Sequence, residues 1–156
     1  LDEDGRLAAA GKADEAALNA LMTHDYFGAV PPKSLDRNAF ASTPVEGLSV
    51  EDGAATLAAF TAASIARARD HFLEEPQLWV VSGGGRRNKT LMTMIAGGVE
   101  AAVAPAEAAG FDGDAVEAEA WAYLAVRSLK GLPITFPGTT GVRAATMGGV
   151  LACKPS

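Results

Sequence analysis

Several features are scarce in this chain of 156 residues, and each scarcity argues against a class of protein. The one cysteine, Cys153, cannot form an internal disulfide. No apolar run approaches the roughly 18 residues that a membrane-spanning helix needs, because charges, glycines or prolines interrupt every run. Basic residues number 13 against 19 acidic ones, for a net charge of −6, and they are scattered along the chain. We therefore expect neither a nucleic-acid partner nor a membrane partner.

The ends and the composition of the chain indicate its size class and location. The chain opens on Leu1 and shows no basic-then-apolar leader, so we expect a cytoplasmic protein of which this sequence is a piece. The length suits one ordinary domain rather than two. Alanine makes up about a fifth of the residues, so the hydrophobic share of 49% overstates the bulky apolar surface that the fold can bury.

The hydrophobic pattern predicts alternating helices and strands. Helical spacing and helix-capping residues are found in four segments, which are Asp14–Met22, Val50–Leu73, Asn88–Ala96 and Asp114–Leu129. The apolar run Leu78–Val81 does not alternate with polar residues, which favours a parallel strand covered on both faces. Val99–Ala104 is a weaker strand candidate, and Trp79 and Trp121 are expected in the core. The alternation indicates an α/β fold with short parallel strands flanked by helices.

The most informative motif is a glycine triplet between the predicted strand and the predicted helix at Asn88. Gly83, Gly84 and Gly85 let the backbone approach a ligand, and the N–H groups at a helix start favour an anionic or polar ligand such as a nucleotide. The segment narrowly misses the common phosphate-loop pattern, because Asn88 stands where that pattern has its second glycine. The alternative is a tight turn without a ligand.

Two further segments carry candidate binding groups. Glu117 follows Asp114 by three residues, so it is either the acid of a capping box or a carboxylate that binds sugar hydroxyls at a cleft. Lys33 and Arg37 lie in a loop stiffened by prolines, where they either position a substrate or remain solvated surface charges. The turn Gly138-Thr139-Thr140-Gly141 is either a hydroxyl-rich binding turn or a simple bend. The histidines form no cluster with metal-ligand spacing.

Taken together, four segments resemble the anhydro-N-acetylmuramic acid kinases in order and in spacing. Their sequences are Y-F-G-A-V-P-P-K-S-L-D-R-N-A-F, V-S-G-G-G-R-R-N, D-A-V-E-A-E-A-W-A-Y-L-A-V-R-S-L-K-G-L-P and F-P-G-T-T-G. The combination of P-P-K-S-x-x-R, G-G-G-x-x-N and E-A-x-A-[FW]-A is more specific than any one of these patterns. The resemblance extends over almost the whole chain.

The resemblance implies a fold, a reaction and a set of site residues. The fold is that of the actin, hexokinase and chaperone ATPases, in which two lobes close over a nucleotide. The reaction uses ATP and Mg²⁺ to phosphorylate 1,6-anhydro-N-acetylmuramic acid while water opens the anhydro bridge, giving N-acetylmuramic acid 6-phosphate in peptidoglycan recycling. By position, Gly83, Gly84, Gly85 and Asn88 match the adenosine-side motif, and Glu117 matches a glutamate that holds the sugar. A homodimer is also expected.

The sequence departs from the family pattern in what it does not contain. The family's phosphate loop and its D-T-G-P-G-N segment, which carries the base aspartate, are not found in residues 1–156. We therefore interpret residues 1–156 as the C-terminal part of the second lobe and expect this piece alone to be inactive. Two alternatives stay open, namely a kinase of the same superfamily for another sugar and a nucleotide-sensing or interaction module without catalysis.

Overall fold

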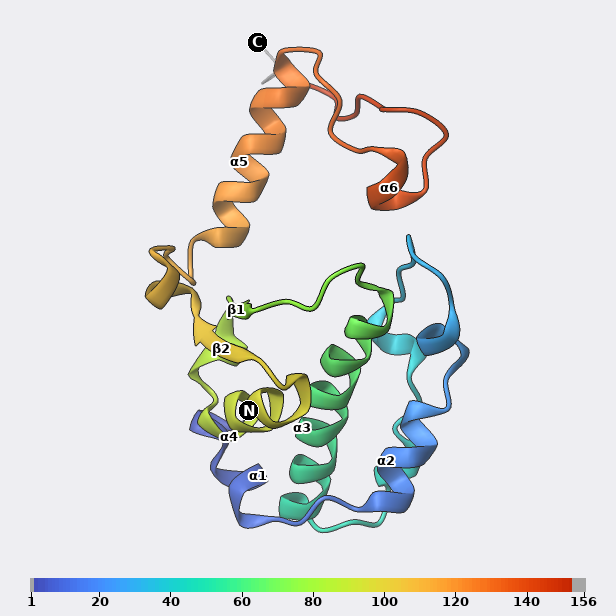
Figure 1. Cartoon of the computed structure of the whole chain (residues 1–156), viewed down its shortest axis with the longest axis vertical. Coiled ribbons are helices and arrows are strands. Elements are labelled where there is room, and N and C mark those ends of the chain that lie inside the picture. Colours follow the sequence, from blue (N-terminus) through green and yellow to red (C-terminus); the bar gives the residue numbers. More distant parts are fainter. Residues whose placement is uncertain (1, 153–156) are drawn as a thin grey trace.

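The computed structural model describes residues 2–152 of the chain (Figure 1). The lone cysteine, Cys153, lies outside the described residues. The helices are α1 (Arg6–Ala10), α2 (Glu15–Met22), α3 (Val50–Ala66), α4 (Lys89–Val99), α5 (Val116–Leu129) and α6 (Pro137–Thr140), and the strands are β1 (Leu78–Val81) and β2 (Ala102–Pro105). Short 3-10 turns join several of these elements.

Side-chain caps start three of the predicted helices where the sequence places them. The oxygens of Asp14, Ser49 and Asn88 accept hydrogen bonds from backbone N–H groups in the first turns of α2, α3 and α4 respectively. Helix α3 ends at Ala66 and continues as a 3-10 turn over Arg67–His71, so the segment predicted as one long helix tightens in its last turns. These helices are confirmed.

The two strands form a parallel pair that α4 connects. Leu78 lies opposite Ala102 and Val81 opposite Pro105. The second strand begins later than predicted, because Val99 still belongs to α4 and is buried with it. The α/β class with short parallel strands is confirmed.

One expectation about β1 is wrong, because the strand is covered on one face only. Trp79 packs against the core formed by Ala62 of α3 with Ile95 and Val99 of α4. Leu78 and Val80 point the other way and are 50% and 44% exposed. The run lacks polar alternation although the described residues leave its second face about half exposed. A sequence run reports which side chains are apolar and not which of them a partner covers.

Helix α5 extends away from the body formed by α1, α2, α3, α4 and the sheet (Figure 1). None of its residues is buried, and Trp121 is 66% exposed, so the expectation of a core position for Trp121 is wrong. The end of the helix is as predicted, because Gly131 adopts a φ of 63° and Leu132 donates its N–H to the carbonyl of Arg127.

The proline-rich loop is held on α3 by aromatic packing. The ring of Phe40 lies 5.1 Å from that of Phe60 and 5.9 Å from that of Phe27, and Phe27 meets Phe60 edge-on at 6.0 Å. The loop between Tyr26 and Glu46, which the sequence indicates is long and irregular, is therefore anchored at its base.

Close backbone packing at Gly11 gives a first test of the fold. A β-carbon there would lie 2.0 Å from the carbonyl oxygen of Glu51, so Gly11→Ala is expected to destabilise the protein by about 1–3 kcal/mol in urea unfolding. Gly53, inside α3, has open space around it. The control Gly53→Ala is expected to stabilise the protein by about 0.5–1 kcal/mol. Equal effects of the two substitutions would contradict the packing of α1 on α3.

Candidate functional site

The glycine triplet forms the turn between β1 and α4. Gly83 has φ 72° and ψ −173°, a conformation that L side chains avoid, and residues 84–87 form a 3-10 turn. A β-carbon built at Gly83 or Gly84 meets no described atom within 4 Å. The space beside the turn is therefore open to a ligand, and side chains at these two positions would occupy it.

Asn88, predicted as a nucleotide contact, also has a structural role as the N-cap of α4. Its Oδ1 accepts the N–H of Leu91 at 2.8 Å and caps α4. Gly5 lies against the same oxygen, because a β-carbon at Gly5 would come within 2.1 Å of it. The cap uses one of the two polar atoms of the side chain, so the Nδ2 amide is the part of Asn88 that can donate to a nucleotide.

The turn is fastened to the segment that precedes α5. Arg86 donates from Nε to Oε1 of Glu107 at 2.8 Å and from Nη1 to Oδ1 of Asp114 at 2.9 Å. The guanidinium lowers the pKa of Asp114 and of Glu107 through these hydrogen bonds. Arg87 contacts the second carboxylate oxygen of Asp114.

Glu117 lies in the first turn of α5 as an exposed carboxylate. The capping-box interpretation is wrong, because Ala115 is the cap residue and makes no side-chain cap bond, while Asp114 pairs with the arginines. This leaves the carboxylate of Glu117 exposed and available to bind a ligand. The backbone N–H of Gly83 donates to the carbonyl of Gly113 at 2.9 Å, so the structure brings the glycine turn next to the segment that carries Glu117.

The ion pairs of Asp114 predict an acid-sensitive contribution to stability. A folded-state pKa below the ordinary 3.8 means that this carboxylate stabilises the fold above pH 3.8 and loses that effect as the pH falls through the lowered value. Asp114→Asn is therefore expected to lower the Tm at pH 7 by a small amount, with a difference from wild type that shrinks towards pH 3. A difference that grew on acidification would contradict these pairs.

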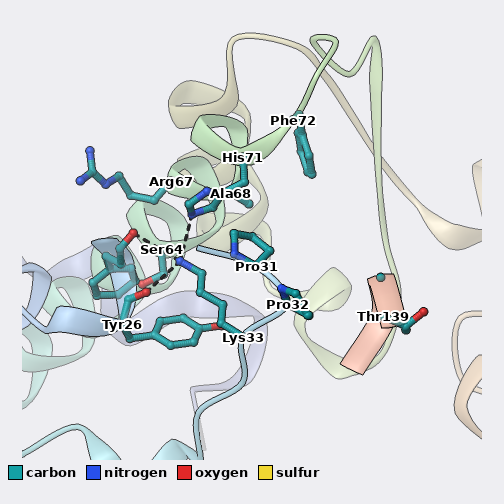
Figure 2. Close-up of a pocket in the computed structure, with 12 residues that line it drawn as sticks. Tyr26, Pro31, Pro32, Lys33, Ser64, Arg67, Ala68, His71, Phe72 and Thr139 are labelled. Atoms are coloured by element: carbon teal, nitrogen blue, oxygen red, sulfur yellow. Dashed lines mark hydrogen bonds between the residues drawn. The ribbon is translucent and has the colours of Figure 1, made fainter. Parts of the chain in front are cut away.

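Lys33 lines a separate pocket of about 280 Å³, shown in Figure 2. The pocket lies between the proline loop, the end of α3 with its following turn, and the α6 turn, from which Thr139 contributes (Figure 2). The glycine turn and Glu117 are not among its lining residues. The structure thus joins Lys33 to the Thr139 turn but leaves both apart from the glycine turn. The backbone of Arg37 lies in a 3-10 turn, and its side chain is outside what the structure describes.

The ammonium of Lys33 has three acceptors inside the protein. Nζ donates to the carbonyls of Tyr26 and Phe27 at 2.8 and 3.3 Å, and it lies 3.0 Å from Nε2 of His71. An ammonium only donates, so Nε2 of His71 is placed as its acceptor. Sequence reasoning missed His71 because its partner is 38 residues away.

Neither a metal centre nor a membrane span is found in the described part of the chain. Among residues 2–152, no three His, Cys, Asp or Glu side chains are grouped so that they could hold a metal ion. In the same range, no helix combines the length and the apolarity that crossing a membrane demands.

Comparison with known proteins identifies the family. A family model described as anhydro-N-acetylmuramic acid kinase matches residues 1–154. Proteins with that name are 57% identical over 149 residues in Rhodospirillum rubrum, 55% over 154 in Rhizobium rhizogenes and 55% over 148 in Caulobacter vibrioides. These alignments cover 95–97% of this chain and 40–41% of the relatives, so the chain spans about two-fifths of their length.

The matches first define the class of protein as the carbohydrate kinases, because each of these relatives is named as a kinase of a carbohydrate. The chain belongs to the anhydro-N-acetylmuramic acid kinase family. The sequence resemblance is thereby confirmed over nearly the whole chain.

Proposed function

We propose that the protein containing this chain is an ATP-dependent kinase that converts 1,6-anhydro-N-acetylmuramic acid to N-acetylmuramic acid 6-phosphate, with water opening the anhydro ring. The observation that carries the proposal is the family match over residues 1–154, supported by an open glycine turn at the end of a parallel strand. On this proposal, residues 1–156 form the C-terminal part of the second lobe of an actin-like ATPase fold.

The nucleotide side of the site is the turn after β1. Gly83 and Gly84 leave room for the adenosine against the backbone, while Gly85 completes the turn with its Cα facing Leu91, and Asn88 donates from its free amide edge. ATP is the phosphate donor, and Mg²⁺ accompanies its phosphates and neutralises their charge. No step is assigned to Mg²⁺ through residues of this chain.

The sugar side of the site begins at α5. The exposed carboxylate of Glu117 accepts hydrogen bonds from sugar hydroxyls and orients the ring, which raises the rate by holding the reacting atoms in place. Lys33 and Arg37 are proposed as further substrate-side contacts. Lys33 acts there through its positive charge in the pocket, because its three protons already have acceptors.

Gly84→Val tests the nucleotide assignment in the full-length protein. A β-carbon at Gly84 meets no described atom within 4 Å, so folding should tolerate the substitution, while the valine fills the ligand space. We expect the KM for ATP to rise at least tenfold with a Tm near that of wild type. Gly28→Val, also in open space, is the control that should leave the KM unchanged. Unchanged ATP kinetics in a folded Gly84→Val protein would remove the turn from the site.

The substrate, the oligomer and the location have simple tests. We expect the full-length protein to consume ATP with the anhydro sugar, and not with unbridged N-acetylmuramic acid or glucose. ATP consumption with a different sugar alone would assign the protein to another substrate.

We further propose that the full-length protein is a homodimer and is cytoplasmic. Sedimentation tests the first proposal and cell fractionation the second.

A further inference from the structure

Arg86 is the residue of the glycine turn whose side chain faces the protein rather than the open side. Its side chain is 6% exposed, although it carries a full charge. Nε and Nη2 both bind Oε1 of Glu107, at 2.8 and 2.7 Å. Nη1 binds both Oδ1 of Asp114, at 2.9 Å, and the carbonyl of Gly83, at 2.8 Å. All three guanidinium nitrogens are therefore engaged inside the protein, in contacts with the turn and with the segment before α5.

These bonds fix the peptide groups on both sides of Gly83. The N–H of Gly83 donates to the carbonyl of Gly113, while its carbonyl accepts from Arg86. Gly113 itself lies against the guanidinium, because a β-carbon there would come 2.2 Å from Nε of Arg86. One cation thus holds the positive-φ conformation of Gly83 and also the segment that leads into α5.

We propose that Arg86 is a positioning residue that shapes the glycine turn for the nucleotide and ties it to the start of α5, where Glu117 lies. The inference rests on the proposed function of the turn and adds to it the residue that sets its geometry. The task requires a guanidinium. A planar fork binds two carboxylates and a carbonyl in fixed directions, whereas a lysine ammonium is a point charge without that geometry.

The structure supplies a matched control in the next residue. Arg87 has the same charge and contacts the same Asp114, but its side chain is 65% exposed and makes no bond to the backbone of the turn. If a substitution acts only by removing positive charge near the nucleotide, substitutions of Arg86 and of Arg87 have the same effect on nucleotide binding. If it acts through the geometry of the turn, only the substitution of Arg86 has an effect.

Steady-state kinetics of the full-length protein test the proposal. Arg86→Gln is expected to raise the KM for ATP at least tenfold, which corresponds to about 1.4 kcal/mol, and the KM for the sugar severalfold, with kcat at saturation within threefold of wild type. Arg86→Lys should behave like Arg86→Gln, and Arg87→Gln should change neither KM more than twofold. A merely structural role would lower the Tm and the active fraction, and with them the apparent kcat, but not the KM values.

The outcomes separate this proposal from the proposed function. Arg86→Gln or Arg86→Lys with wild-type KM values, or Arg87→Gln with equally raised ones, overturns the positioning role while kinase activity stands. An unchanged KM for ATP in Gly84→Val overturns the assignment of the glycine turn to the nucleotide. If Arg86→Gln does not fold, Asp114→Asn removes one partner of the guanidinium, and it must raise the KM for ATP at least threefold for the proposal to survive.

Discussion

Glu117→Ala in the full-length protein is expected to lower kcat/KM for the anhydro sugar at least tenfold, about 1.4 kcal/mol, while the Tm stays within about a degree of wild type. The carboxylate is exposed and caps no helix, so its removal costs the fold little. Its removal leaves sugar hydroxyls without an acceptor in the bound state, which is expensive. The measurement is initial rate against sugar concentration at saturating ATP.

The first turn of α5 supplies the matched control. Glu119 is an exposed acid of the same turn and interacts similarly with the helix dipole. Glu119→Ala should therefore reproduce any electrostatic effect on the helix but leave kcat/KM within twofold of wild type. A fall in Tm without a change in kcat/KM for Glu117→Ala would return this residue to a structural role.

A complete loss of activity is expected for a polypeptide limited to residues 1–156. Phosphoryl transfer needs a phosphate cradle, a metal ion at the phosphates and a positioned base, and the chain spans about two-fifths of its relatives' length. On the proposed function, its residues supply only the glycine turn for the nucleotide and Glu117, Lys33 and Arg37 for the sugar. We expect no ATP-dependent phosphorylation of the anhydro sugar by the short polypeptide and normal turnover by the full-length protein.

The test of the short polypeptide needs two controls. The short polypeptide must be shown free of host kinase and tested for nucleotide binding, which should be weak. Turnover of the anhydro sugar by residues 1–156 alone would mean that the catalytic base lies within this chain, and it would overturn the expectation that the base lies elsewhere in the full-length protein.

Local sequence predicted the elements well, because their signals are local. Asp14, Ser49 and Asn88 each start a helix a few residues before the apolar positions that follow. The prediction of a capping box at Asp114 is wrong because of a contact with a residue that is distant in the sequence. The carboxylate that could have turned back to the helix instead pairs with Arg86, 28 residues away in the sequence.

In the candidate site, too, local motifs predict some features, whereas contacts between residues far apart in the sequence could not be predicted. The glycine turn and Glu117 could be predicted from motifs, since each is read over a few residues. The two carboxylate partners of Arg86 and the contact between Lys33 and His71 join residues 21 to 38 positions apart, and only the fold brings them together. The exposure of Trp121 was missed because an apolar helix face indicates burial without naming the partner that covers it.

Hydrogen–deuterium exchange of the full-length protein, with a non-hydrolysable ATP analogue and with the anhydro sugar added separately, tests the central claim most directly. If the glycine turn binds the nucleotide and the start of α5 binds the sugar, the analogue slows amide exchange in residues 82–88, the sugar slows it in residues 113–119, and neither ligand changes exchange in α2. Unchanged exchange in both segments, in a protein that turns over both ligands, would contradict the assignment of this chain to the nucleotide and sugar sites.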